Sequence, residues 1–333
     1  MKYPVKRLVG TSSDGKHVGQ HCQLSGVAAG GLDSEEMGPY VAYQPFGYKS
    51  LIIEIDWSPR VMDETRNVIE FGQYKVPVTS MGSGRPLVFL HGFDGPQEGP
   101  FMNALAEDRR VIAPTHPGFA GSPSHPDIHS IHNTVIFYLD LFDELGLPTL
   151  YLAGHSLGGM FAAEIAALIP ERVRHLVLVS PFAFWSDEAP LPDVLATGGS
   201  ALSRLLWADP EAEAAAAYQP APFDRTCNWA AATNYLWPLP DRGLASRMHR
   251  IKTPTLLARG SDDRMVGNEY LQACAQLLPA ATVAEIAGAG HFSMLERPDR
   301  FSQAVAAFLD SYPSSRAGPV ARTGPGARRE GSR

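Results

Sequence analysis

The chain has few cysteines, no long apolar run and no excess of positive charge. Its three cysteines, Cys22, Cys227 and Cys274, are scattered over 333 residues and match neither a disulfide framework nor a zinc-binding pattern. No stretch approaches the roughly 20 consecutive apolar residues that span a bilayer. The N-terminal residues also lack the apolar core of a signal peptide. We therefore expect a cytoplasmic protein without membrane insertion.

The overall charge is slightly acidic. A formal net charge of −7 gives no reason to expect nucleic acid as a partner. The hydrophobic content of 44% is ample for a sizeable core, in one large domain or two ordinary ones. A homo-oligomer is compatible with this composition, which leaves the oligomeric state open.

Short apolar runs alternate with helical patterns from residue 67 onwards. Residues 68–71 and 74–79 alternate as the strands of an antiparallel hairpin do. Helical spacing marks residues 131–142 and 301–309. Continuous runs typical of parallel strands buried on both faces lie at 86–90, 110–114, 150–153, 173–180, 255–260 and 282–286. The alternation predicts the α/β fold class, with a doubly wound, mostly parallel sheet built from residues 67–181 and 248–312.

Three segments lie outside this pattern. Residues 1–66 are a poorly defined N-terminal extension in which residues 51–57 look like one strand. This extension either packs on the core or is partly disordered. A start codon placed too far upstream would produce the same pattern. Residues 182–247 carry alanine-rich helical stretches and four of the five tryptophans, which predicts a helical cap inserted between two strands. Residues 313–333 are rich in Gly, Pro and Arg and are expected to form a disordered tail.

The sequence Gly154-His155-Ser156-Leu157-Gly158 joins one of the predicted buried strands to a helix rich in small residues. This G-x-S-x-G pattern is typical of a nucleophile elbow. Two glycines remove the side chains that would collide in a strained strand-to-helix turn, and this lifts the serine hydroxyl clear of the sheet. We interpret Ser156 as a catalytic nucleophile; the alternative is a glycine-rich turn without chemistry.

A serine nucleophile needs a base and an orienting acid. Two loops that follow predicted strands supply candidates, and the carboxyl ends of parallel strands meet at one edge of a sheet. Asp262 and Asp263 follow the strand at 255–260, and His291 follows the strand at 282–286. The order serine, aspartate, histidine is the one that accompanies a G-x-S-x-G elbow.

From about Asn67 to Tyr312 the chain resembles the α/β-hydrolase superfamily with a helical cap. The resemblance rests on five motifs in order, which begin at His91, Pro117, Gly154, Gly260 and Gly290. It implies a triad in which Ser156 is the nucleophile, His291 the general base and acid, and Asp263, with Asp262 as the alternative, the orienting acid. It also implies that the backbone N–H groups of Phe93 and Leu157 form the oxyanion hole.

The resemblance implies a serine hydrolase that acts through an acyl-enzyme, without cofactor or metal, on a small, largely apolar ester. A C–C bond hydrolase of the meta-cleavage diketone type is the alternative, although such enzymes usually carry Asn where this chain has His155. A non-catalytic receptor or interaction module of the same fold is a third reading. We expect the substrate pocket to include His155, Phe182, Trp185 and Trp237; for most of the tryptophans, packing inside the cap is the favoured role.

Overall fold

The computed structural model describes the strands within residues 5–55, residues 64–236 and residues 243–311. The chain divides into two compact units, Met1–Val61 and Met62–Arg333. In the first unit four strands form an antiparallel sheet in the order β2-β1-β4-β3. Their bounds are Val5–Thr11 (β1), His17–Val18 (β2), Tyr40–Tyr43 (β3) and Leu51–Ile55 (β4). The strand expected at residues 51–57 is thus β4.

The second unit is organised around an eight-stranded sheet in the order β12-β11-β10-β9-β7-β8-β6-β5. Strands β7 to β12 pair in parallel, and β5 and β6 continue the sheet in antiparallel pairing. This confirms the predicted fold class. The strands are Glu64–Phe71 (β5), Tyr74–Met81 (β6), Arg85–Leu90 (β7), Arg109–Pro114 (β8), Leu150–His155 (β9), Val173–Val179 (β10), Thr255–Gly260 (β11) and Ala281–Ile286 (β12).

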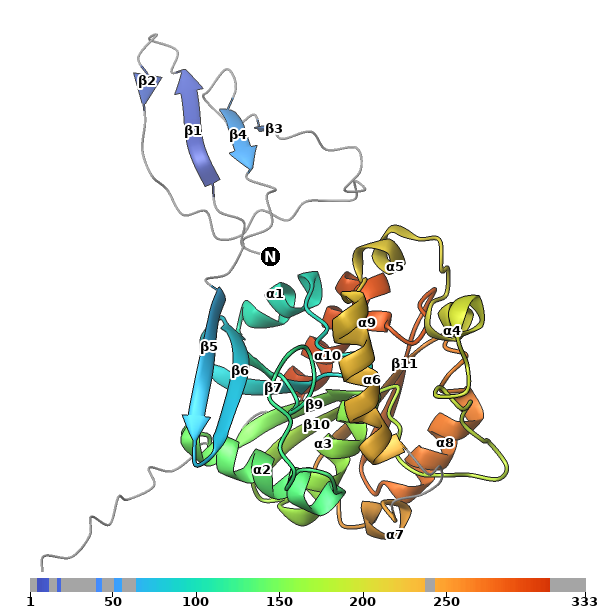
Figure 1. Ribbon diagram of the computed structural model, residues 1–333. Helices are drawn as coiled ribbons and strands as arrows, with labels where there is room; N and C mark the ends of the chain where they lie inside the picture. Colours follow the sequence, from blue (N-terminus) through green and yellow to red (C-terminus); the bar gives the residue numbers. More distant parts are fainter. Residues whose placement is uncertain are drawn as a thin grey trace, which may run out of the picture. The chain divides into compact units, whose positions relative to one another are not determined.

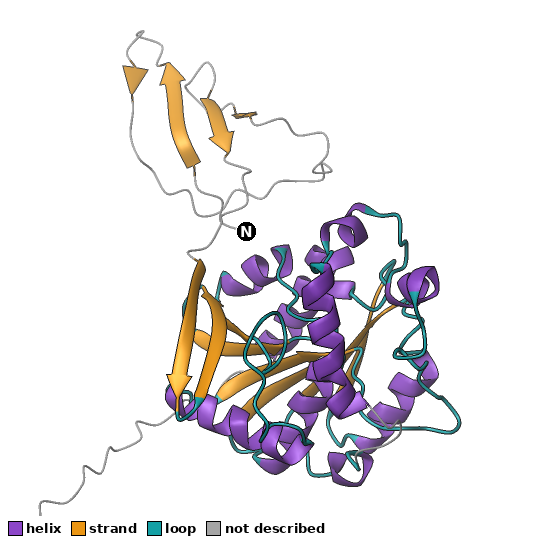
Figure 2. Ribbon diagram, in the orientation of Figure 1, coloured by secondary structure: helices purple, strands orange, loops and turns teal. Residues whose placement is uncertain are grey.

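Helices cover this sheet (Figures 1 and 2). Helix α3 packs on β7, β9 and β10 and contacts α2, while α8 packs on β11 and β12. Helix α10 contacts α1 and β12. The bounds are Pro100–Ala106 (α1), Ile131–Glu144 (α2), Leu157–Leu168 (α3), Asn268–Leu277 (α8), Ser293–Glu296 (α9) and Pro298–Ser311 (α10).

The burial of the strands follows from the sequence pattern. Every residue of β9 and β11 is buried, as expected for central strands covered on both faces, whereas most of β5 is exposed at the edge of the sheet. Strand β5 begins at Glu64, upstream of the expected Val68, because its ladder with β6 continues until Glu64 lies opposite Met81.

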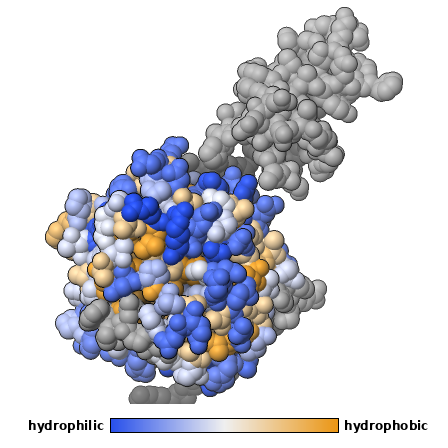
Figure 3. All heavy atoms as spheres, turned by 90° about the vertical axis from the view of Figure 1, so that its right-hand side faces the viewer, coloured by the Kyte–Doolittle hydropathy of each residue, from blue (hydrophilic) through white to orange (hydrophobic). Residues whose placement is uncertain are grey.

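The segment between β10 and β11 carries four helices within its described residues. They are Gly199–Leu206 (α4), Glu213–Ala217 (α5), Pro222–Leu236 (α6) and Ala245–Met248 (α7). The face of the molecule that includes α4 and α8 mixes hydrophilic and hydrophobic side chains, with apolar atoms in a hollow between polar ones (Figure 3). Trp237 and the predicted tail at 313–333 lie outside the described residues.

No helix within the described residues is long and apolar enough to cross a membrane.

Candidate active site

The turn between β9 and α3 holds Ser156 in a strained conformation. Its φ of 54° lies in the left-handed region, which is rare for a residue other than glycine. A Cβ on Gly154 would overlap the carbonyl oxygen of Gly158, and a Cβ on Gly158 would overlap that of Leu90. The two glycines are therefore required by close backbone approach, as the elbow interpretation expects.

The backbone of Ser156 is fixed while its hydroxyl is not. Its N–H donates to the carbonyl of Val179 at 2.9 Å, and its carbonyl accepts from the N–H of Phe182 at 3.0 Å. The side-chain oxygen is buried and has no hydrogen-bond partner among the described residues. A buried hydroxyl without a partner is costly in a purely structural role, and such groups are frequent at functional sites.

His291 is oriented by Asp263. Its Nδ1 lies 3.2 Å from the Asp263 carboxylate, whose other oxygen accepts from the N–H groups of Met265 at 2.8 Å and Val266 at 2.9 Å. Because an ionised carboxylate only accepts, Nδ1 carries the proton in this pair, and Nε2 is the nitrogen that can accept a proton from a neighbouring group. That Nε2 is buried and has no partner among the described residues. By contrast, Asp262 is exposed and accepts from the hydroxyl of Ser261.

Burial alone would raise the pKa of Asp263, but the charge of His291 and its hydrogen bond hold that pKa below the usual range. The carboxylate is therefore ionised at neutral pH. It can stabilise a positive charge that develops on His291.

The loops after β7, β9 and β12 meet at one place. A Cβ on Gly92 would stand 3.2 Å from the Ser156 Cβ and 2.7 Å from Nδ1 of His155. The Nε2–H of His155 donates to the carbonyl of His291 at 3.0 Å, and the two rings lie 4.7 Å apart. Burial, and then the neighbouring His291, lower the pKa of His155 well below its usual value. His155 is thus a neutral side chain whose hydrogen bond links the loop after β9 to the loop after β12.

His91 supports the turn that leads to Phe93. Its Nδ1–H donates to the carbonyl of Gly92 at 2.9 Å, and its Nε2 accepts from the N–H of His116 at 2.9 Å. Both ring nitrogens are therefore occupied. Within the described residues no group of three or more His, Cys, Asp or Glu side chains is arranged to hold a metal ion.

An aromatic layer lies beside the His291 ring. Phe182 stacks on Phe93 at 6.0 Å and lies 5.7 Å from the His291 ring, while Trp229 of α6 meets Phe93 edge to face at 5.7 Å. Ser156 and His291 are both 0% exposed. Neither side chain is therefore open to solvent.

A cavity of about 940 Å³ lies among α4, α6 and the loop after β7. Its lining includes the apolar residues Leu206, Trp207 and Trp229 together with the charged residues Asp94 and Arg225. Leu206 also accepts from the N–H of His291 at 2.8 Å, so the cavity adjoins the histidine loop.

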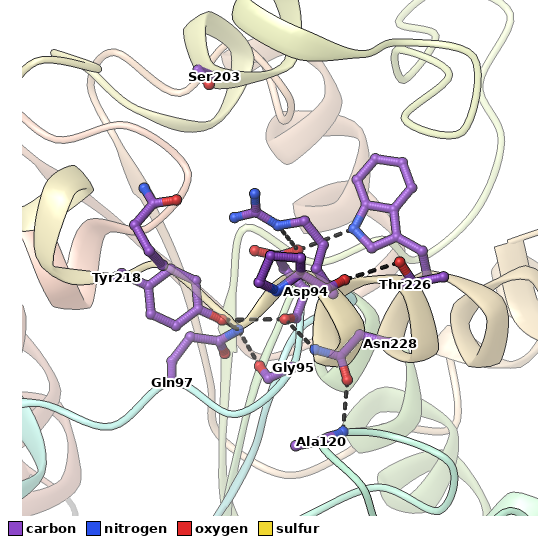
Figure 4. Close-up of polar contacts among 12 residues, drawn as sticks. Asp94, Gly95, Gln97, Ala120, Ser203, Tyr218, Thr226 and Asn228 are labelled. Atoms are coloured by element: carbon purple, nitrogen blue, oxygen red, sulfur yellow. Dashed lines mark hydrogen bonds and ion pairs between the residues drawn. The ribbon is translucent and has the colours of Figure 1, made fainter.

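The other expected pocket residues fall in different places. Phe182 belongs to the aromatic layer, whereas the indole N–H of Trp185 donates to Asp187 of its own segment at 2.8 Å. Sequence reasoning missed Asp94 and its partners Asn228 and Arg225 on α6. Figure 4 shows the contact between Asp94 and Asn228. The one available signal was a charged residue directly after the predicted oxyanion donor Phe93.

Comparisons with known proteins identify the family of this chain. Residues 87–304, well over half of the chain, match the alpha/beta hydrolase family, and the chain belongs to that family. A protein of Pseudomonas syringae pv. syringae named "Putative carbamate hydrolase RutD" is 31% identical over 64% of this chain and 88% of its own length. The 2-hydroxy-6-oxo-2,4-heptadienoate hydrolase of Pseudomonas putida is 26% identical over 74% of this chain and 96% of its own.

Solved structures show the same fold. The carboxylesterase CesB from Bacillus subtilis superposes with a TM-score of 0.60 at 22% identity, covering 77% of this chain and 94% of that one. Naproxen esterase from the same organism gives a TM-score of 0.60 at 18% identity, over 75% of this chain and 92% of its own. Together with the family match, these likenesses define a hydrolase of the alpha/beta fold.

Proposed function

We propose that this protein is a serine hydrolase that cleaves an ester-type, largely apolar small molecule through an acyl-enzyme. The observation that carries the proposal is the pair of His291 and Asp263 at 3.2 Å, with the Ser156 hydroxyl and Nε2 of His291 both buried and without partners. A nucleophile, a base with its lone pair available and an ionised orienting acid are the minimum set for this chemistry.

In the proposed cycle the Ser156 oxygen attacks the substrate carbonyl while Nε2 of His291 takes the hydroxyl proton. The N–H groups of Phe93 and Leu157 donate to the oxyanion of the tetrahedral intermediate. His291 then gives its proton to the leaving alcohol, which leaves the acyl group on Ser156. A water molecule, deprotonated by His291, attacks that acyl group, and His291 returns the proton to the Ser156 oxygen as the acid leaves.

A C–C bond hydrolase is the second candidate. It is supported by the 26% identity to the heptadienoate hydrolase, which covers nearly all of that protein. The similarity to two proteins named as carboxylesterases and the presence of His155 before Ser156 favour an ester substrate. A panel of p-nitrophenyl esters, lactones and dienone acids, measured with one enzyme preparation, ranks the two candidates by kcat/KM.

The test of the mechanism is Ser156→Ala. We expect turnover of short p-nitrophenyl esters to fall on the order of 10⁴- to 10⁶-fold, because no other group can form the acyl-enzyme. A fluorophosphonate should label the wild type and not this variant. The exposed Ser246→Ala on α7 is the matched control and should keep both properties. Near-wild-type turnover in Ser156→Ala would exclude the proposed nucleophile.

A further inference from the structure

Asp94 joins the loop after β7 to helix α6. Its carboxylate accepts from the indole N–H of Trp229 at 3.0 Å and lies 3.6 Å from Nε of Arg225. Its main-chain carbonyl accepts from the side-chain amide of Asn228 at 2.7 Å (Figure 4). Asp94 is only 4% exposed, and burial raises its pKa, while Trp229 and Arg225 act in the opposite direction. Helix α6 therefore contacts Asp94 at three residues, two of them on the buried carboxylate and one on the main-chain carbonyl.

The same loop is fixed on both sides of Phe93. On one side the N–H of Gly92 donates to the side-chain oxygen of Gln97 at 2.9 Å. The amide nitrogen of Gln97 in turn donates to the carbonyl of Gly95 at 2.5 Å. On the other side is the Asp94 carbonyl, which Asn228 holds. The Phe93 N–H thus lies between two anchored peptide groups.

Helix α6 sits so close to this loop that a Cβ on Gly95, whose φ is 107°, would overlap the Asn228 side chain. Asn228 also accepts from the N–H of Ala120 at 2.7 Å, and this ties α6 to the loop after β8. Glycine at 92 and 95 gives the loop alternative conformations that other residues lack. External contacts are therefore needed to select one of them.

We propose that Asp94 is a positioning residue through which helix α6 sets the Phe93 N–H in the geometry that receives the oxyanion. The proposal rests on the proposed serine-hydrolase function. Donors of an oxyanion hole act on the charge that develops in the transition state, so their displacement lowers kcat more than it raises KM. Loss of the α6 contact should accordingly reduce the chemical step and leave substrate binding nearly unchanged.

The main variant is Trp229→Phe, which keeps an aromatic ring at this position but removes the N–H donor to Asp94 and part of the indole volume. We expect kcat for a p-nitrophenyl ester to fall about 10-fold or more, with KM within about 3-fold, because one misplaced oxyanion donor costs up to 10²–10³ in kcat. Asp94→Ala should give a similar loss. Asp94→Asn keeps an acceptor for the indole N–H and should restore kcat to within about 3-fold of the wild type.

A trifluoromethyl ketone supplies a readout that a merely structural role would not move. Its carbonyl takes up the Ser156 oxygen to form a tetrahedral hemiketal oxyanion, with the serine proton held on His291. We expect its inhibition constant to rise in Trp229→Phe by the same factor by which kcat/KM falls. Affinity for a non-reactive competitive ligand, the product acid, should stay within about 3-fold. Thr233→Ala, an exposed change on α6, is the matched control.

Measurements of melting temperature and circular dichroism show whether each variant is folded. If Asp94→Ala is unfolded, the comparison of Trp229→Phe with Asp94→Asn still decides. Equal ketone affinity in the wild type and in Trp229→Phe would overturn the positioning role, as would a loss expressed only in KM. Neither result affects the proposed function, which fails independently if Ser156→Ala keeps its activity.

Discussion

At the scale of single residues, Asp262 and Asp263 are neighbours in sequence with opposite surroundings. Asp263 is buried and contacts His291, whereas Asp262 is exposed. We expect Asp263→Asn to reduce kcat on the order of 10³- to 10⁴-fold, because an amide in place of the carboxylate loses the charge that stabilises the imidazolium and can favour the wrong tautomer. Ester hydrolysis at saturating substrate measures this loss.

Asp262→Asn is the matched control for that change and should stay within about 2-fold of the wild type, since its side chain is exposed and only Ser261 bonds to it. The pKa of Asp263 is held below its usual range, so the carboxylate is ionised throughout neutral pH. Protonation of Asp263 itself should therefore add no pH dependence to the wild-type rate near neutral pH. Equal losses in the two variants would assign the orienting role to neither aspartate alone.

The residues of the proposed triad could be predicted from the sequence because each sits in a short local pattern. Ser156 lies between two glycines, and Asp263 and His291 each follow an apolar strand. The sequence around Asp94 gives no comparable signal, because the residues that donate hydrogen bonds to it, Asn228 and Trp229, lie far along the chain. A contact between distant segments leaves no periodicity in either of them.

At the scale of elements, the elbow between β9 and α3 depends on space that only glycine leaves. A Cβ on Gly158 would overlap the carbonyl oxygen of Leu90, which is backbone and cannot move aside cheaply. We expect Gly158→Ala to lower the free energy of unfolding by about 3 kcal/mol or more, beyond the usual cost of overpacking, and to abolish activity. Urea unfolding followed by circular dichroism measures the first effect.

Gly198→Ala is the matched control for Gly158→Ala. Gly198 precedes α4, and nothing lies within 4 Å of the position its Cβ would occupy. The free energy of unfolding of Gly198→Ala should differ from that of the wild type by less than about 1 kcal/mol. A Gly158→Ala variant as stable and active as Gly198→Ala would show that the turn relaxes easily and that the elbow glycine has no steric role.

Helices and strands are easier to predict from the sequence when their burial is regular along the element. Strands β9 and β11 are buried throughout and read as continuous apolar runs. Helix α6 is harder to recognise because its inward face includes the polar Asn228, which bonds to two loops. A helix that docks through hydrogen bonds has a weaker apolar stripe than one that docks through packing.

At the scale of the whole molecule, the chain separates into Met1–Val61 and Met62–Arg333. The eight strands β5 to β12 form one sheet inside the second unit. Strand β5 is an edge strand of this sheet and pairs with β6. Ser156, Asp263 and His291, together with the loop that carries Asp94, also belong to this unit. The strands of the larger sheet and the residues of the proposed site thus all belong to the second unit.

We accordingly expect a chain that begins at Met62 to fold alone and to hydrolyse p-nitrophenyl esters with kcat and KM within about 2-fold of the full-length protein, because no strand of the larger sheet loses its partner. Differential scanning calorimetry of the two chains tests the stability, and the transition of the larger unit should keep its midpoint. A chain that begins at Val76 is the opposing control, since it removes β5 and the first two residues of β6 and leaves the rest of β6 unpaired on one side. A truncation at Met62 that lowered the midpoint as much as the one at Val76 would show that the second unit needs the first in order to fold.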